Sequence, residues 1–133
     1  MLLVDTNVIG ELMRQRPDPG VEQWMRALPD GQGLFLSVIT VDEIFYGLSR
    51  APQQAKQRWF DHFVAANAIV DITETIARRA GEIRAMLSLR GQVRSQADML
   101  IAATAQTHAL TLVTRNVRDF DGCGIAVLNP FSA

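Results

Sequence analysis

Cysteine, lysine and histidine are scarce in this sequence, and each shortage excludes a kind of protein. The 133 residues include one cysteine, Cys123, so an internal disulfide and a cysteine-ligated metal site are both excluded. A single cysteine is compatible with the reducing cytosol, and we expect a cytoplasmic protein. The two histidines, His62 and His108, stand alone in the sequence and do not predict a histidine metal site.

Long apolar runs and glycine-rich phosphate loops are also missing. No apolar run approaches the length of about 18 residues that a membrane span needs, so we expect no contact with a membrane. The apolar start at residues 1–4 is too short for the core of a signal peptide. Residues 31–33 read Gly-Gln-Gly but lack the third glycine of a dinucleotide loop, and no Gly-x-x-x-x-Gly-Lys is present.

Positive charge is not in excess either. The net charge is −1, which excludes the overall basic character of many nucleic-acid binders. Twelve of the 13 basic residues are arginine, and Lys56 is the only lysine. Arginine has a planar fork that suits phosphate and carboxylate partners. Arg90 and Arg94 could therefore contact phosphates or a partner's carboxylates, although a solvated face explains them equally well.

Short runs of consecutive apolar residues alternate along the chain with segments in which apolar residues recur at helical spacing. Short apolar runs predict strands at residues 2–4, 34–38, 69–72, 110–113 and 125–128. Helical spacing predicts helices at residues 7–14, 21–28 and 52–66, and from the caps Thr40, Thr73 and Ser95 to about residues 50, 90 and 108. Alternating strands and helices favour an α/β fold. We expect one domain over residues 1–133, with a mainly parallel sheet of four or five strands and helices on both faces.

Acidic residues occur where the carboxyl ends of such strands would lie. Asp5 follows the first strand, while Glu43 and Asp98 fall in the first turns of predicted helices. Thr114 and Asn116 follow the fourth strand. Ligands of open parallel sheets bind at this rim, so we expect these side chains to share one site.

Each acid also has a purely structural explanation. Asp5 could cap the helix after it. Glu43 could complete a capping box with Thr40, and Asp98 could do the same with Ser95. Asp42 is an alternative to Glu43, and the two side chains point about 100° apart on a helix.

The loop after the fourth strand offers a further carboxylate. Asp119 or Asp121 could supply it, with Thr114 and Asn116 positioning water, while ordinary loop polarity explains the same residues. Three or four carboxylates at one rim repel one another unless a cation enters. Oxygen-only ligands suit Mg²⁺ or Mn²⁺. Hydrolysis of phosphodiester bonds is the chemistry that we expect of such a site.

Four segments in order resemble the PIN domain, and specifically its VapC-type toxins. They are Leu-Val-Asp-Thr-Asn-Val-Ile at 3–9, Ser-Val-Ile-Thr-Val-Asp-Glu at 37–43, Ala-Asp-Met-Leu-Ile-Ala-Ala at 97–103, and Val-Thr-Arg-Asn at 113–116 with Asp-Phe at 119–120. The chain then closes on Leu-Asn-Pro at 128–130. The resemblance therefore covers essentially the whole chain.

The resemblance implies a Mg²⁺-dependent endoribonuclease that acts as the toxin of a toxin–antitoxin pair. It implies an RNA substrate, a VapB-type antitoxin as partner and a homodimer. Asp5, Glu43 and Asp98 match the three acidic positions of the family, with Asp5 and Asp98 the principal metal ligands. The fourth acid is assigned to Asp119, although some members carry it at the position of Asn116. The supporting residues are Thr6, Asn7, Thr114 and Asn116.

Two other functions remain open from the sequence. A phosphatase of the haloacid dehalogenase kind also begins with a strand that ends in an aspartate, here Asp5, which acts as nucleophile. The second aspartate that such a phosphatase usually carries, two residues further on, is Asn7 here. It also needs a lysine near the phosphate, and Lys56, the only lysine, has no recognisable motif around it. The other alternative is a non-catalytic binding module that kept the PIN fold. No motif predicts which RNA would be cut.

Overall fold

The computed structural model describes residues 1–132 and shows the alternating α/β architecture. The strands are β1 (Leu2–Val4), β2 (Leu34–Ser37), β3 (Ala68–Val70), β4 (Thr111–Val113) and β5 (Val127–Leu128). The α-helices are α1 (Thr6–Leu12), α2 (Pro19–Ala27), α3 (Val38–Arg50), α4 (Gln54–Ala66), α5 (Glu74–Leu89) and α6 (Gln96–Thr107). A short 3₁₀ helix, η1 (Val117–Phe120), follows β4.

All five strands form one parallel sheet in the order β3-β2-β1-β4-β5. The first strand of the chain is therefore the central one. Its partners are β2, with Leu2 opposite Leu34, and β4, with Val4 opposite Val113. The strand order reverses between β2 and β4, on the two sides of β1. The carboxyl end of β1 thus lies at the switch point where open α/β sheets bind their ligands.

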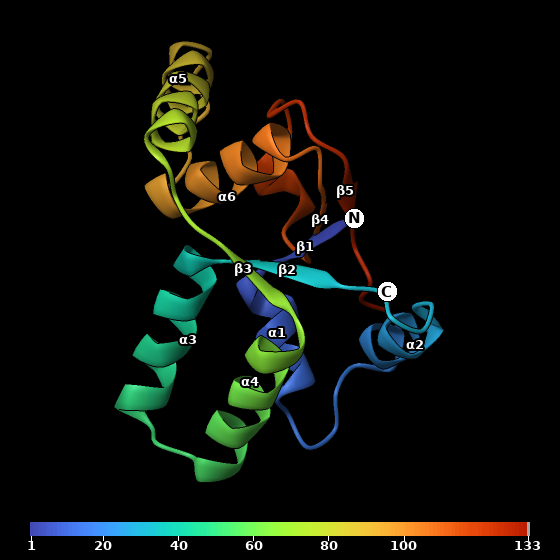
Figure 1. Cartoon of the computed structure of the whole chain (residues 1–133). Helices are drawn as coiled ribbons and strands as arrows, with labels where there is room; N and C mark the ends of the chain where they lie inside the picture. Colours follow the sequence, from blue (N-terminus) through green and yellow to red (C-terminus); the bar gives the residue numbers. More distant parts are fainter. Residues whose placement is uncertain (133) are drawn as a thin grey trace.

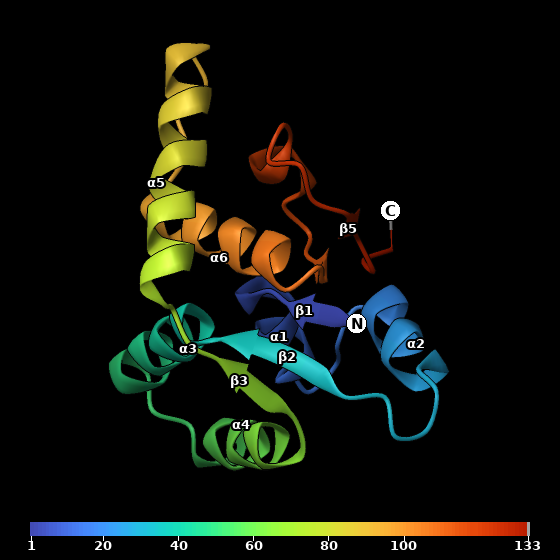
Figure 2. The same cartoon turned by 45° about the horizontal axis from the view of Figure 1, so that its top comes forward.

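Helices cover both faces of the sheet, as the sequence predicts. Figures 1 and 2 show α1 to α4 on one side and α5 with α6 on the other. Successive strand residues point to opposite faces. Leu3 and Leu112 accordingly join the core under α5 and α6, and Val4 and Val113 join the core under α1 to α4.

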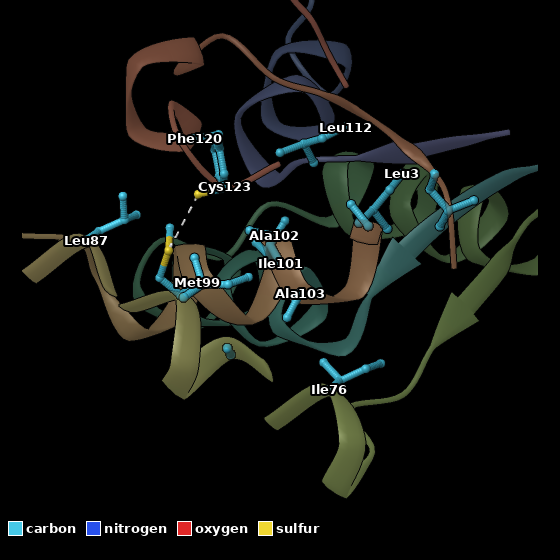
Figure 3. Close-up of a cluster of buried hydrophobic side chains, with 14 residues drawn as sticks. Leu3, Ile76, Leu87, Met99, Ile101, Ala102, Ala103, Leu112, Phe120 and Cys123 are labelled. Carbon is cyan, nitrogen blue, oxygen red and sulfur yellow. Dashed lines mark hydrogen bonds between the residues drawn. The ribbon is translucent and has the colours of Figure 1, made fainter. Parts of the chain in front are cut away.

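The core under α5 and α6 is closed by the loop after η1. Met99, Ala102 and Ala103 of α6 lie beneath Leu112, and the thiol of Cys123 contacts the sulfur of Met99 at 3.8 Å (Figure 3). Burial raises the pKa of the Cys123 thiol above its usual value. This cysteine packs as an apolar side chain.

The predicted cap at Thr40 is wrong. The Ser37 hydroxyl caps α3 by accepting the Ile39 N–H at 3.0 Å, so the helix begins at Val38, which the sequence places in the strand. The chain turns directly from β2 into the helix because serine satisfies the first free N–H groups. Thr40 is inside the first turn and only 1% exposed. The proposed Thr40–Glu43 capping box therefore does not form.

Several other boundaries differ by a few residues. The fourth helix begins at Gln54, after Pro52, because the chain is still extended at Gln53. The second helix begins earlier than expected, at Pro19, because Asp18 caps it. The caps predicted at Thr73 and Ser95 are confirmed. Within residues 1–132, none of the helices combines the length and the apolar character that crossing a membrane requires.

Candidate active site

The rim at the carboxyl ends of the central strands collects the polar side chains that the sequence predicts. Asp5 follows β1 directly and Thr114 follows β4, while α3 begins directly after β2. Asp5 and Thr114 are buried, at 5% and 0% exposure. A buried carboxylate is costly unless donors or a cation compensate it. Asp5 therefore needs hydrogen-bond donors from its surroundings.

Both oxygens of Asp5 accept hydrogen bonds. Oδ1 accepts the backbone N–H of Thr6 at 2.8 Å, which makes Asp5 the cap of α1. Oδ2 accepts the Thr114 hydroxyl at 2.8 Å and the Asn7 side-chain amide at 3.2 Å. Asp5 can therefore cap α1 through Oδ1 and also belong to the candidate site, so its explanations as a helix cap and as a site residue are compatible.

Asn7 ties α1 to the loop after β4. Its Nδ2 also donates to Thr114 Oγ1 at 3.1 Å, and its Oδ1 accepts the backbone N–H of Arg115 at 3.0 Å. The backbone N–H of Asn116 donates to Thr114 Oγ1 at 3.1 Å. These bonds place Asn7, Thr114 and Asn116 around Asp5, as predicted, and leave the Asn116 side chain exposed.

The pKa of the Asp5 carboxyl is raised above its usual value, chiefly because burial penalises its charge. The hydrogen bonds from Thr114 and Thr6 act in the opposite direction by stabilising the ionised form. The negative charges of Asp98 and Glu43 raise the pKa further. The carboxyl groups of Asp5, Glu43 and Asp98 therefore interact electrostatically.

Glu43 is held from α1, not by a cap of its own helix. Its Oε1 accepts the Thr6 hydroxyl at 2.6 Å, and that hydroxyl also lies 3.1 Å from the hydroxyl of Thr40. Sequence reasoning missed Thr40 as a member of this network, because Thr6 and Thr40 are 34 residues apart and no local pattern links them. Asp42, the alternative to Glu43, is exposed and takes no part in these bonds.

Asp98 occupies the first turn of α6, as predicted. The Ser95 hydroxyl caps this helix by accepting the Asp98 backbone N–H at 3.0 Å. The pKa of the half-buried Asp98 carboxyl is raised, first by burial and then by the charges of Asp119 and Glu43, while the Ser95 hydroxyl and Arg94 lower it. Asp98 thus faces acids from two other segments.

The loop after β4 brings Asp119 toward Asp98. Asp119 lies in η1 and is exposed, and its charge raises the pKa of Asp98. The alternative, Asp121, instead affects the pKa of Cys123. The backbone carbonyl of Asp121 accepts Nη2 of Arg94 at 3.2 Å, which joins the end of η1 to the approach to α6. The influence of Asp119 on the pKa of Asp98 is consistent with its choice over Asp121 as the fourth acid, which stays a prediction.

Arg94 is partly buried and is bonded within the protein. Its Nη2 holds the Asp121 carbonyl, and its Nε is buried without a hydrogen-bond partner among residues 1–132. Its positive charge lowers the pKa of Asp98. Arg94 thus joins the end of η1 to the segment before α6, and its contact with a phosphate or a partner's carboxylate stays a prediction.

The charges of Glu43 and Asp98 act on Asp5, and those of Glu43 and Asp119 act on Asp98. In the described part of the chain, no group of three or more histidine, cysteine, aspartate or glutamate side chains is compact enough to hold a metal ion by itself. Mg²⁺ commonly needs only one or two carboxylates because it keeps several waters. The all-oxygen donor set and the mutual repulsion at Asp5 and Asp98 fit a divalent cation of this kind.

Comparison with known proteins assigns a family to this arrangement. The family model described as PIN domain matches residues 2–122, a span that contains all four acids. The chain is 33% identical to toxin FitB of Neisseria gonorrhoeae, covering 98% of this chain and 99% of that protein. It is 30% identical to VapC ribonuclease Y4jK of Sinorhizobium fredii, covering 98% of each.

A solved structure agrees with these relatives. A chain in a toxin–antitoxin complex from Klebsiella pneumoniae superimposes with a TM-score of 0.78 at 30% sequence identity, covering 100% of both chains. The fold, the family model and the relatives thus agree over nearly the full length. The chain belongs to the PIN domain family, in the group of toxins that includes toxin FitB and the VapC ribonucleases.

Proposed function

We propose that this protein is a divalent-metal-dependent endoribonuclease and the toxin of a toxin–antitoxin pair. The observation that carries the proposal is the gathering of Asp5, Glu43, Asp98 and Asp119 at one rim, where burial raises the pKa of Asp5 and Asp98 and the charges of neighbouring acids raise it further. A structural cap gains nothing from facing other acids, whereas a cation site needs them. The ribonuclease named among the relatives supports RNA as the substrate.

The ion of the proposal is Mg²⁺, with Mn²⁺ able to replace it, and its ligands are Asp5 and Asp98. When bound, the ion would stabilise the negative charge that develops on the phosphate during hydrolysis. Asp5 is suited to this role because Thr114 and Asn7 fix one oxygen and the Thr6 N–H fixes the other.

The remaining acids act on water in this proposal. Glu43 is exposed and fixed at Oε1 by Thr6, so its other oxygen is available to orient an attacking water or accept its proton. Asp119 supports a further water beside Asp98. Thr114 and Asn116 hold the loop that carries Asp119, through the bond from the Asn116 N–H to the Thr114 hydroxyl.

The phosphatase alternative fits these contacts poorly. The second aspartate that such a phosphatase uses as an acid is Asn7 here, and its side-chain amide donates to Asp5 Oδ2 instead. Lys56 lines a hollow of about 240 Å³ together with Glu43, and Asp5 is not part of its lining. Trapping a phosphorylated Asp5 would reverse this preference.

The decisive experiment is cleavage of single-stranded RNA by the purified protein, with Mg²⁺ and with EDTA. We expect cleavage only with the metal, and loss of cleavage in the Asp98→Asn protein. The matched control is Asp42→Asn, which removes an exposed carboxylate beside Glu43 and should cleave like the parent. RNA that stays intact with the parent and Mg²⁺ would leave the non-catalytic binding module as the better description.

The antitoxin of the proposal is a VapB-type protein, supported by the toxin–antitoxin complex among the structural relatives. Its gene should be a short open reading frame directly upstream. Expression of this chain alone should arrest growth of a bacterial host, and co-expression of that frame should restore growth. Growth arrest that persists in the Asp98→Asn protein would show that toxicity does not come from cleavage.

We further propose a cytoplasmic homodimer. Support comes from large apolar side chains that stay exposed in a single copy, above all Leu89 at 90% and Val93 at 87%, at the end of α5 and just after it. This end of α5 projects from the body of the molecule in Figure 1. Light scattering after size exclusion should give twice the mass of one chain, and a monomer at micromolar concentration would contradict the dimer.

A further inference from the structure

The acidic rim poses an electrostatic problem for the function proposed above. Its four carboxylates and the net charge of −1 repel the phosphates of RNA. A bound cation relieves the repulsion only at its own position, so the neighbouring phosphates of the strand need other positive partners. Arginine is the side chain best suited to them, because its fork donates two parallel hydrogen bonds to a phosphate.

Arg115 stands at this rim, one residue beyond Thr114. Its backbone N–H donates to Asn7 Oδ1 at 3.0 Å, so its main chain belongs to the network that holds Asp5. Its side chain is exposed. The ion pairs of the described residues use other arginines, which are Arg14, Arg26, Arg78 and Arg79. The charge of Arg115 is therefore available to a ligand.

The guanidinium of Arg115 is held in place by an aromatic ring from the end of the chain. Its central carbon lies 4.8 Å from the centre of the Phe131 ring, within the range of a cation–π contact. An exposed arginine normally samples many rotamers, and a bound phosphate must overcome that freedom. A stacked guanidinium has already lost part of it, so less is lost on binding.

Phe131 is itself anchored by the segment around it. The Ser132 N–H and hydroxyl donate to the carboxylate of Asp18, at 2.9 and 2.5 Å. These bonds lower the pKa of Asp18 to about 2. The backbone of 130–132 also lies so close to Gly20 that a side-chain carbon there would meet Pro130 O and Ser132 N at 2.6 Å. The end of the chain is thus fitted against the start of α2.

We propose that Arg115 binds a phosphate of the RNA strand next to the acidic site, and that Phe131 is the positioning residue that holds it there. The inference rests on the ribonuclease function proposed above. It extends the site beyond its four acids to a residue of the rim loop and a residue of the final segment, 16 positions further along the sequence.

The first test measures binding of fluorescein-labelled single-stranded RNA of mixed sequence in EDTA, by anisotropy at several salt concentrations. Arg115→Gln should weaken binding by roughly 3- to 10-fold. It should also reduce the slope of log Kd against log salt by about 0.7, the value for one lost phosphate contact on a single strand. The matched control is Arg50→Gln, because Arg50 stacks on Tyr46 at 5.6 Å at the far end of α3.

The second test separates positioning from packing at Phe131, which also packs on the core under α1 to α4. Phe131→Leu keeps an apolar side chain and removes the ring, whereas Phe131→Tyr keeps the ring. With Mg²⁺, we expect the leucine protein to show a KM raised about threefold at unchanged kcat, and the tyrosine protein to match the parent. A structural role alone would lower the melting temperature of the leucine protein without raising KM.

The outcomes distinguish this inference from the function it rests on. If the parent cleaves RNA but Arg115→Gln binds RNA with the affinity and salt slope of Arg50→Gln, the phosphate contact is refuted and the ribonuclease stands. If Arg115→Gln has the expected effect but Phe131→Leu leaves KM unchanged, the positioning role of Phe131 is refuted. If the parent neither binds nor cleaves RNA, both proposals fail.

Discussion

The two sides of the acidic rim are built differently. On the β1–β4 side, Asp5 is buried and its two oxygens accept three hydrogen bonds, from Thr6, Asn7 and Thr114. On the α6–η1 side, Asp98 is half-buried and Asp119 is exposed, and after burial the largest influence on the pKa of Asp98 is a single hydrogen bond with the Ser95 hydroxyl. The carboxylate of Asp5 therefore has more hydrogen-bond donors around it than that of Asp98.

This difference indicates a division of labour between the two sides. A fixed ligand defines where a cation sits, while side chains with fewer bonds can move toward it as charge is neutralised. Of the three hydrogen bonds that fix Asp5, those from Thr6 and Asn7 are local, and the one from Thr114 joins residues 109 positions apart in the sequence. Substitutions on the two sides of the rim should therefore differ in the size of their effects.

The largest effect should come from the fixed acid. Asp5→Asn should lower kcat/KM for RNA cleavage by roughly 10³-fold, because a neutral amide cannot hold the cation in place. Asp119→Asn should cost only about 10- to 100-fold, as expected for a residue that acts through water. Initial rates of both proteins at one Mg²⁺ concentration provide the comparison. Equal losses would mean that the two sides do not differ.

The second-largest effect should be a decrease in the free energy of unfolding. Thr114→Val removes the donor to Asp5 Oδ2 and should lower the free energy of unfolding by about 1–3 kcal/mol at pH 7, because a buried carboxylate loses a partner. The control is Thr111→Val in β4, the strand that Thr114 follows, at a partly exposed position. Urea denaturation measures both changes. A Thr114→Val protein as stable as the Thr111→Val protein would show that Asp5 does not depend on this bond.

Metal binding should stabilise the folded protein more modestly. At ten times its dissociation constant, Mg²⁺ should raise the melting temperature by about 5 °C, because it binds only the folded site. Asp5→Asn should abolish this shift, and Asp42→Asn should keep it. The absence of any shift in the parent, with Mg²⁺ or Mn²⁺, would count against a metal site at this rim.

The smallest effect should be a pH dependence from Asp98. Its pKa is raised in the folded protein, so its contribution to stability is fully present below the unfolded value of 3.8 and is lost as pH rises through the folded pKa. In EDTA, the Asp98→Asn protein should therefore melt above the parent at pH 7, and the difference should shrink toward pH 4. Mg²⁺ should reverse the order at pH 7. A difference that does not depend on pH would contradict repulsion at Asp98.

The sequence predicts the sheet well and the starts of some helices poorly. Leu2–Val4 and Thr111–Val113 are recognisable because buried parallel strands are apolar on both faces. Thr40 misled the prediction because Thr-x-x-Glu matches a capping box, while Ser37 makes a cap three residues earlier at the strand end. Local patterns cannot decide between two caps when the choice depends on where the strand stops.

The acids of the site could be predicted from the sequence, but most of their supports could not. Asp5 and Asp98 are recognisable from their places after a strand and in a first turn, whereas the choice of Asp119 over Asp121 came only from the resemblance to the PIN domain. The bond from Thr6 to Glu43 and the stack of Arg115 on Phe131 join segments that no periodicity connects. Such contacts exist only once the chain has folded, so sequence patterns contain no local sign of them.

The central position of β1 has a consequence for how the protein is made. Synthesis produces Asp5 among the first residues, but its partner Thr114 is 109 positions later and Asp119 comes later still. A growing chain therefore has its first acid long before the fourth strand that encloses it. Pairings over such long separations form slowly. The proposed site therefore cannot be complete in a nascent chain until translation is nearly finished.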